Sequence, residues 1–154
     1  MMDQFLAFSA EITAFTTLEL RGTGMAQAYL DAISTAVGSP LLEELLAKYA
    51  AIKDDGQQSR KQQLERGIFG DEKLGPIARN ILKMWYIGIW EPLPRVWTEQ
   101  YGPIANNVGF MVSAAAYREG LLWTAIGATP PGAKAPGYAS WVSPPNVPRV
   151  PETR

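Results

Sequence analysis

Residues 75–94, GPIARNILKMWYIGIWEPLP, decide the fold of this chain. Proline suits the first position of a helix, where its missing N–H needs no partner, so Gly75-Pro76 predicts a helix start. From residue 77 to 87, apolar residues cover most of the helical circumference and leave one narrow polar stripe. Gly88 is suited to end the helix, and the prolines at 92 and 94 then lead the chain out along a surface. The pattern predicts a central helix that is buried on almost all sides; its polar stripe consists of Arg79, Asn80 and Lys83.

Two interpretations of this stretch stay open at the level of sequence. It can be the central helix of a small helical core, which is the commoner meaning of such a pattern. Alternatively, another protein covers part of its apolar surface, especially Trp85, Tyr86 and Trp90. Both interpretations can hold together, because a helix can be buried against its own domain on one side and against a partner on another.

The composition excludes many kinds of chemistry. The chain has 154 residues, a formal net charge of −1, and no cysteine or histidine. Disulfides, cysteine-ligated iron–sulfur clusters, ordinary zinc sites and nucleophiles paired with histidine are therefore ruled out. Without a basic cluster or a run of 18 apolar residues, we expect neither nucleic-acid binding nor membrane insertion. The length predicts one domain with a substantial core.

Helical spacing recurs on both sides of the central stretch. We expect an amphipathic helix over residues 3–15, a long helix over 16–38 opened by a capping box of Thr16 and Glu19, and a third helix from Pro40 to 53. A polar helix over 57–66 precedes the central helix. After an irregular segment with a short helical turn, Ser113 caps a helix that extends to Gly127.

Two local patterns inside these segments need an interpretation. Gly22-Thr23-Gly24 resembles the beginning of a dinucleotide fingerprint, but Gln27 occupies the place of the third glycine and no strand precedes it. We therefore expect these small residues to mark a close approach between helices. The paired carboxylates, among them Asp71-Glu72, are adjacent in sequence and point in different directions on a helix, which favours surface charge.

The end of the chain differs from the rest. Seven of the twelve prolines lie in the last 25 residues, a density that neither a helix nor a central strand tolerates. Because this segment keeps Tyr138 and Trp141, it can fold back on its own domain or dock on a partner. We predict an all-α fold in one unit: a small irregular helical domain of about five helices, residues 1–127, followed by a proline-rich extended strap, residues 128–154.

Three stretches together resemble one protein family: LRGTGMAQAYL at 20–30, LGPIARNILKMWYIGIW at 74–90 and YREGLLWTAIGATPPGAKAPGYASWVSPP at 117–145. They are similar to the small, or gamma, subunit of bacterial FAD-dependent sugar and polyol dehydrogenases, which act on glucose, sorbitol, fructose or glucosides (glucoside 3-dehydrogenase). The similarity covers most of the chain and keeps the order of the blocks. Family members commonly have histidine where Thr129 stands here.

The resemblance implies a non-catalytic subunit in an oxidoreductase complex. Its partner would be a large flavoprotein of the glucose–methanol–choline type that binds FAD and often an iron–sulfur cluster, with a multihaem cytochrome c as a possible third component. The small subunit would assist maturation and carry the twin-arginine signal that exports the heterodimer to the periplasm. No Arg-Arg pair occurs in the chain, so we expect a mature or truncated form, or a relative with another route. The residues expected at, or supporting, the partner interface are Trp85, Tyr86, Trp90, Trp123, Lys134, Tyr138 and Trp141.

Two rival functions stay open. The chain can be a chaperone that releases its client after folding, which differs from a subunit in the lifetime of the complex. It can also be an enzyme that processes glycosides with a carboxylate pair such as Glu91 and Glu99, although nothing in their spacing supports this. The accessory-subunit hypothesis assigns no catalytic residue, cofactor or metal to this chain.

Overall fold

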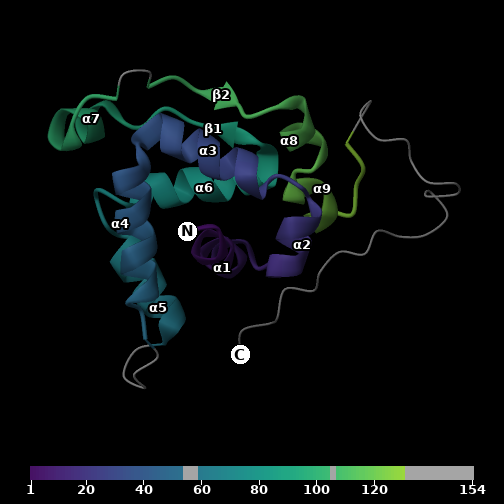
Figure 1. Ribbon diagram of the computed structural model, residues 1–154, viewed down its shortest axis with the longest axis horizontal. Helices are drawn as coiled ribbons and strands as arrows, with labels where there is room; N and C mark the ends of the chain where they lie inside the picture. Colours follow the sequence, from purple (N-terminus) through teal and green to yellow (C-terminus); the bar gives the residue numbers. More distant parts are fainter. Residues whose placement is uncertain (54–58, 105–106, 131–154) are drawn as a thin grey trace, which may run out of the picture.

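Helix α6 (Gly75–Ile87) lies at the centre of the computed structural model, with α1 (Met2–Thr13) and α3 (Ala26–Val37) packed on it (Figure 1). The structure describes residues 1–53, 59–104 and 107–130. The domain is mostly helical, which confirms the all-α prediction, although its helices are more numerous and shorter than expected. In chain order, the other elements are α2 (Thr17–Gly22), α4 (Ser39–Ala50), α5 (Arg60–Leu64), the π-helical turn η1 (Glu65–Phe69), β1 (Ile89–Trp90), α7 (Arg95–Tyr101), β2 (Phe110–Met111), α8 (Ala114–Arg118) and α9 (Leu121–Ala125).

The central helix begins and ends where the sequence predicts. Pro76 stands in its first turn, and Gly88 ends it in the left-handed conformation (φ 73°), with its N–H donating to the carbonyl of Met84 at 2.9 Å. Within α6, all of which the structure describes, Arg79 alone is exposed. Burial on almost all sides is therefore confirmed, and most of it comes from the chain's own helices.

The buried Asn80 explains how a polar residue is accommodated on this helix. Its amide nitrogen donates to the carbonyl of Glu91 at 2.8 Å, and its amide oxygen accepts from the N–H of Glu91 at 3.2 Å. The Asn80 side chain thus satisfies both the N–H and the C=O of Glu91, as a neighbouring strand would. Glu91 directly follows β1, which pairs antiparallel with β2 through Ile89 and Met111. The sequence did not predict this short strand pair.

The predicted long helix over residues 16–38 is wrong in one respect, because the structure divides it into α2 and α3. The capping box at its start is confirmed, with reciprocal bonds between Thr16 and Glu19. The helix stops at Thr23, whose hydroxyl donates to the Leu20 carbonyl (2.7 Å) and accepts from the N–H of Met25 (3.1 Å). Such local side-chain bonds compete with the helical pattern, and the left-handed Gly24 (φ 69°) completes the turn.

The predicted helix after Ser113 is also divided. The hydroxyl of Ser113 accepts from the N–H of Ala116 at 3.1 Å, so the cap is confirmed, but the segment breaks at Gly120 into α8 and α9. Gly120 lies so close to the last turn of α6 that a Cβ there would be 2.6 Å from the carbonyl oxygen of Tyr86. Tertiary packing against α6 therefore requires a residue without a Cβ at the break between α8 and α9.

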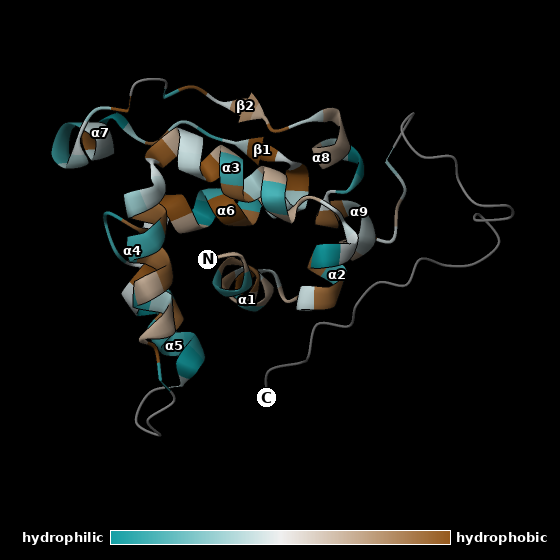
Figure 2. Ribbon diagram, viewed as in Figure 1, coloured by the Kyte–Doolittle hydropathy of each residue, from teal (hydrophilic) through white to brown (hydrophobic). Residues whose placement is uncertain are grey.

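The periphery follows the predicted patterns. Helices α1 and α4 each begin one residue before the expected range and end two or three residues before its end. The polar character expected of the segment before the central helix is confirmed in α5, which is largely hydrophilic in Figure 2. Although α5 buries only Leu64, it is tied to the domain by Arg60, which pairs with Glu11 at 2.9 Å. Residues 54–58 and 131–154, including most of the predicted strap, lie outside the described residues.

Candidate functional site

The three stretches that resemble the dehydrogenase small subunits meet near the C-terminal end of α6. Tyr29 from the first stretch packs edge-on against Trp85 from the second, with ring centroids 4.8 Å apart. The third stretch contributes Gly120, whose close approach to Tyr86 is described above. Segments separated by up to 90 residues in the chain thus form one packed corner.

Two of the predicted interface residues lie inside the chain's own core. Trp85 is 1% exposed and Trp90 is 2% exposed. Trp85 also stacks on Phe5, with ring centroids 6.0 Å apart. Neither indole offers a surface to a partner in this conformation, so any part they take in binding consists of supporting the interface from below. That supporting role stays a prediction.

Tyr86 and Trp123 are only half-buried. The hydroxyl of Tyr86 donates to the carbonyl of Thr13 at 2.9 Å, which joins α6 to the end of α1. The Trp123 indole N–H donates to the carbonyl of Tyr117 at 2.7 Å, and the two rings meet edge-to-face. Both residues keep some surface available for contact. The other three predicted interface residues, Lys134, Tyr138 and Trp141, lie outside the described part of the chain.

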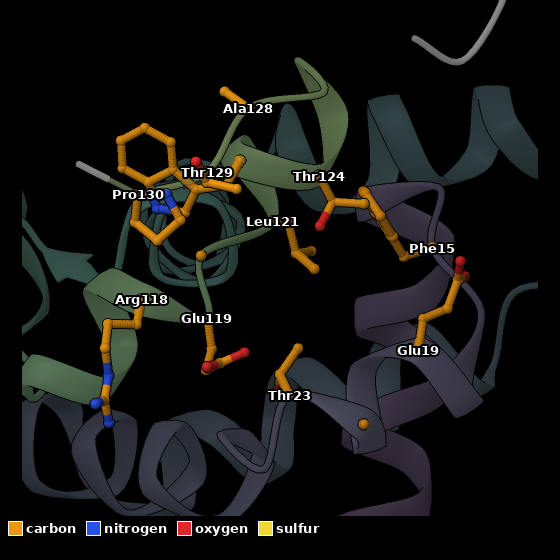
Figure 3. A pocket seen from close by; sticks show the side chains of 13 residues that line it. Phe15, Glu19, Thr23, Arg118, Glu119, Leu121, Thr124, Ala128, Thr129 and Pro130 are labelled. Carbon is orange, nitrogen blue, oxygen red and sulfur yellow. The ribbon is translucent and has the colours of Figure 1, made fainter. Parts of the chain in front are cut away.

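Trp123 lines a hollow between α2 and the α8–α9 corner, which we name the α2–α9 groove (Figure 3). Its volume is about 380 Å³. The chain runs along it as it leaves α9: the N–H of Ala128 donates to the carbonyl of Trp123 at 2.8 Å, and Pro130 is buried there. One wall contains Phe15, Glu19, Gly22 and Thr23, and the other contains Glu119, Leu121, Trp123 and Thr124.

The charge of the groove comes from carboxylates on both walls and one arginine. Glu19 accepts from the backbone N–H and the hydroxyl of Thr16, both at 2.7 Å, and these bonds hold the pKa of its carboxyl below the ordinary value. Figure 3 shows Glu119 directed towards Thr23, whereas Arg118 extends away from the space between them. The lining of the groove therefore combines carboxylates on both walls with apolar side chains.

The buried Tyr29 lies under this corner. Burial, with a smaller contribution from the Glu119 carboxylate, raises the pKa of its phenol. The phenol therefore stays neutral at physiological pH and contributes no charge to the groove. Its hydroxyl and the indole N–H of Trp85 are both buried, and neither has a hydrogen-bond partner in the part of the chain that the structure describes.

The carboxylates considered for glycoside chemistry are engaged elsewhere. Glu91 pairs with Lys83 beside α6, and Glu99 pairs with Arg95 on α7 at 2.9 Å. Among residues 1–53, 59–104 and 107–130, no group of three or more acidic side chains is placed to hold a metal ion. In the same residues, no helix is both long and apolar enough to cross a bilayer.

The glycines at 22 and 24 correct one interpretation made from the sequence. A Cβ added to either would meet no atom of the described residues within 4 Å, so these glycines do not mark a close approach between the helices of the structure. Gly24 is explained by its left-handed backbone, whereas Gly22 faces the groove without such a reason. The two glycines could have indicated a surface feature, but nothing in the sequence placed Gly22 on the groove wall opposite Glu119.

Searches of protein-family models, of curated proteins and of solved structures found no match to this chain.

Proposed function

We propose that this chain is a non-catalytic small subunit that binds and stabilises the large subunit of an FAD-dependent sugar dehydrogenase and assists its maturation and export to the periplasm. FAD, and an iron–sulfur cluster where present, would be held by the large subunit, and a multihaem cytochrome c can complete the complex. The observation that carries the proposal is the convergence of the three resembling stretches, 20–30, 74–90 and the described part of 117–145, at the corner that forms the α2–α9 groove.

The physical character of this corner supports binding more than catalysis. Its packed interior, Tyr29 against Trp85 and Gly120 against α6, makes a rigid base. Its surface combines half-buried aromatic rings with carboxylates whose positions are held by hydrogen bonds, as at Glu19. A rigid base with aromatic anchors lowers the entropy that is lost when a partner docks.

The strap beyond Pro130 extends the proposed interface. Six prolines restrict its unfolded chain and so reduce the entropy lost on docking, and Tyr138 and Trp141 supply apolar surface to bury. We therefore place Lys134, Tyr138 and Trp141 in contact with the large subunit. Because residues 128–130 still line the groove, a chain ending at Pro130 would keep the described fold while losing these three residues.

Co-expression with the flavoprotein large subunit encoded by a neighbouring gene tests the proposal. The expected result is a stoichiometric complex that co-purifies with bound FAD, together with a higher yield of soluble flavoprotein than in its absence. The chain ending at Pro130 should stay folded but bind at least tenfold more weakly, a loss of about 1.4 kcal/mol. A chain that is monodisperse alone and fails to co-purify contradicts the proposal. A raised yield of flavoprotein without a lasting complex would instead identify a chaperone.

A further inference from the structure

The end of the chain repeats proline with the period of a polyproline II helix. Residues 145–151 read PNVPRVP, so that every third residue is proline. A polyproline II helix has three residues per turn, and residues three apart therefore share one face. In this conformation the prolines would form one face, Val147 and Val150 a second, and Asn146 and Arg149 a third. The sequence thus suits a polyproline II segment that buries two apolar faces and exposes a polar one.

The described domain contains a groove of the kind that binds such segments, which we name the α7 groove. It has a volume of about 280 Å³ and is lined by Trp97 and Tyr101, whose ring centroids are 5.4 Å apart. Trp97 forms a fixed base, because it is 4% exposed and its indole N–H donates to the carbonyl of Lys73 at 2.7 Å. Pro76 and Pro94 also line the groove. Grooves with aromatic walls are common docking sites of polyproline II segments.

The α7 groove offers both apolar surface and charge to an occupant. Val96, which also lines it, is 69% exposed, and Tyr101 is half-buried, so apolar area remains to be covered. Glu72 lines the same groove and is exposed. None of the ion pairs among residues 1–53, 59–104 and 107–130 involves Glu72. The charge on the polar face of the proline repeat, Arg149, is complementary to this carboxylate.

The length of chain beyond Pro130 allows the proline repeat to reach this groove. Figure 1 shows α7 and α9 at opposite ends of the domain, and the described chain ends shortly after α9. A compact domain of about 130 residues is roughly 36 Å across. The 15 residues from Pro130 to Pro145 span about 46 Å in an extended polyproline conformation. The chain can therefore cross the domain if residues 131–144 run extended, a form that their prolines favour.

We infer that residues 145–151 dock in the α7 groove of their own molecule as a polyproline II segment. Their apolar faces cover Val96 and Tyr101, and Arg149 lies beside Glu72. The occupant is the same molecule rather than a second copy, because a tether of this length gives the segment a high effective concentration at the groove.

The docking goes beyond the proposed function, since it involves this chain alone. It is compatible with the contacts proposed for Lys134, Tyr138 and Trp141, because residues 131–144 would be held at both ends. A segment held in this way loses less entropy when a partner binds to it.

The first test locates the proline repeat in the full chain. Because the chain has no cysteine, a nitroxide label can be placed on Glu99→Cys, at an exposed position of α7 that does not line the groove. The amide signals of Val147 and Val150 should broaden in nuclear magnetic resonance spectra. A label on Thr124→Cys, exposed on α9, should leave them sharp. Sharp signals with the first label, or equal broadening with both, would overturn the inference.

A mixing experiment distinguishes the two sources of the segment. Unenriched protein that carries the label at position 99 is mixed with unlabelled, ¹⁵N-enriched protein. If the segment docks within its own molecule, the enriched signals stay sharp. Broadening in the mixture would show that a second copy supplies the segment, and this result would overturn the inference.

Two matched pairs of variants test the apolar contact, with the label at position 99 as the reporter. Val96→Lys should lower the docked fraction at least tenfold, whereas Val108→Lys, the same change at a position that is 56% exposed and outside the groove, should not. Pro148→Ala, within the three-residue repeat, should lower the docked fraction more than Pro144→Ala, outside it. Equal effects within either pair would overturn the inference.

A charge exchange tests the position of Arg149. Glu72→Lys and Arg149→Glu should each weaken the docking several-fold, and the double variant should restore it, because the attraction is then reversed in direction but retained. Glu72 is exposed, so its replacement leaves the packing of the domain unchanged. A double variant that docks no better than the single variants would overturn the inference. The large subunit takes no part in these measurements, so their outcome is independent of the proposed function.

Discussion

Gly120→Ala isolates the contact that places α8 and α9 against the central helix. Gly120 has φ −56° and ψ 131°, a conformation that alanine adopts without strain, so the effect comes from the close approach alone. The new Cβ would be 2.6 Å from the carbonyl oxygen of Tyr86, whereas contacts under 3.0 Å are essentially never seen. The α8–α9 corner must then move by about 0.4 Å or more, because a backbone atom of α6 cannot turn aside as a side chain can.

The size of the effect follows from two opposing contributions. Overpacking of this kind costs about 1–3 kcal/mol. Alanine recovers about 0.4–1 kcal/mol by restricting the unfolded chain, so the middle values of the two ranges leave a net loss of about 1–2 kcal/mol in the free energy of unfolding. For a domain of this size, that loss lowers the melting temperature by about 2–8 °C.

Thermal unfolding followed by far-ultraviolet circular dichroism measures this loss, and urea unfolding provides the free energy independently. Gly67→Ala serves as the control, because its Cβ has open space and its melting temperature should stay the same or rise. Gly88→Ala would be less informative, since its positive φ adds backbone strain to a 2.8 Å clash with Ala116. A Gly120→Ala protein that melts at or above the wild-type temperature would refute the packing argument.

Three further changes probe how the helices begin and how α6 meets β1. Asn80→Leu removes both hydrogen bonds to the Glu91 backbone and should cost about 1–3 kcal/mol in urea unfolding; a smaller loss would mean that water replaces the amide. Thr16→Ala should cost about 1 kcal/mol by removing the cap of α2, and an unchanged melting temperature would contradict this. Burial alone would raise the pKa of Asp71, but its ion pair with Lys48 and bonds from backbone N–H groups lower it overall, so its ionised form stabilises the fold above about pH 4. The free energy of unfolding at pH 7 should therefore be higher for the wild type than for Asp71→Asn, by at most about 1 kcal/mol because the ion pair is partly exposed. This difference should shrink as the pH falls below about 4. Equal differences at pH 7 and pH 3 would contradict the prediction.

Local interactions allowed much of the secondary structure to be predicted from the sequence. Pro76 and Gly88 mark the ends of α6, and Thr16 and Ser113 mark helix starts, because caps and backbone conformations depend on residues within one turn. The sequence also indicated that α6 is the central helix, because apolar residues cover most of its circumference and this periodicity is a local property. The absence of cysteine and histidine determined which chemistries this chain cannot carry out.

Contacts between distant segments decided the rest. The sequence could not show that Trp85 and Trp90 face the chain's own core, because an apolar anchor looks the same whether its own domain or a partner covers it. Nor could it show that the helix after Ser113 breaks at Gly120, where the chain packs against a carbonyl of α6 that comes more than 30 residues earlier. The α2–α9 groove exists only because that break and the turn after Gly22 bring Glu19 and Glu119 to facing walls. Such a surface arises from the packing of helices, and local sequence patterns carry no information about it.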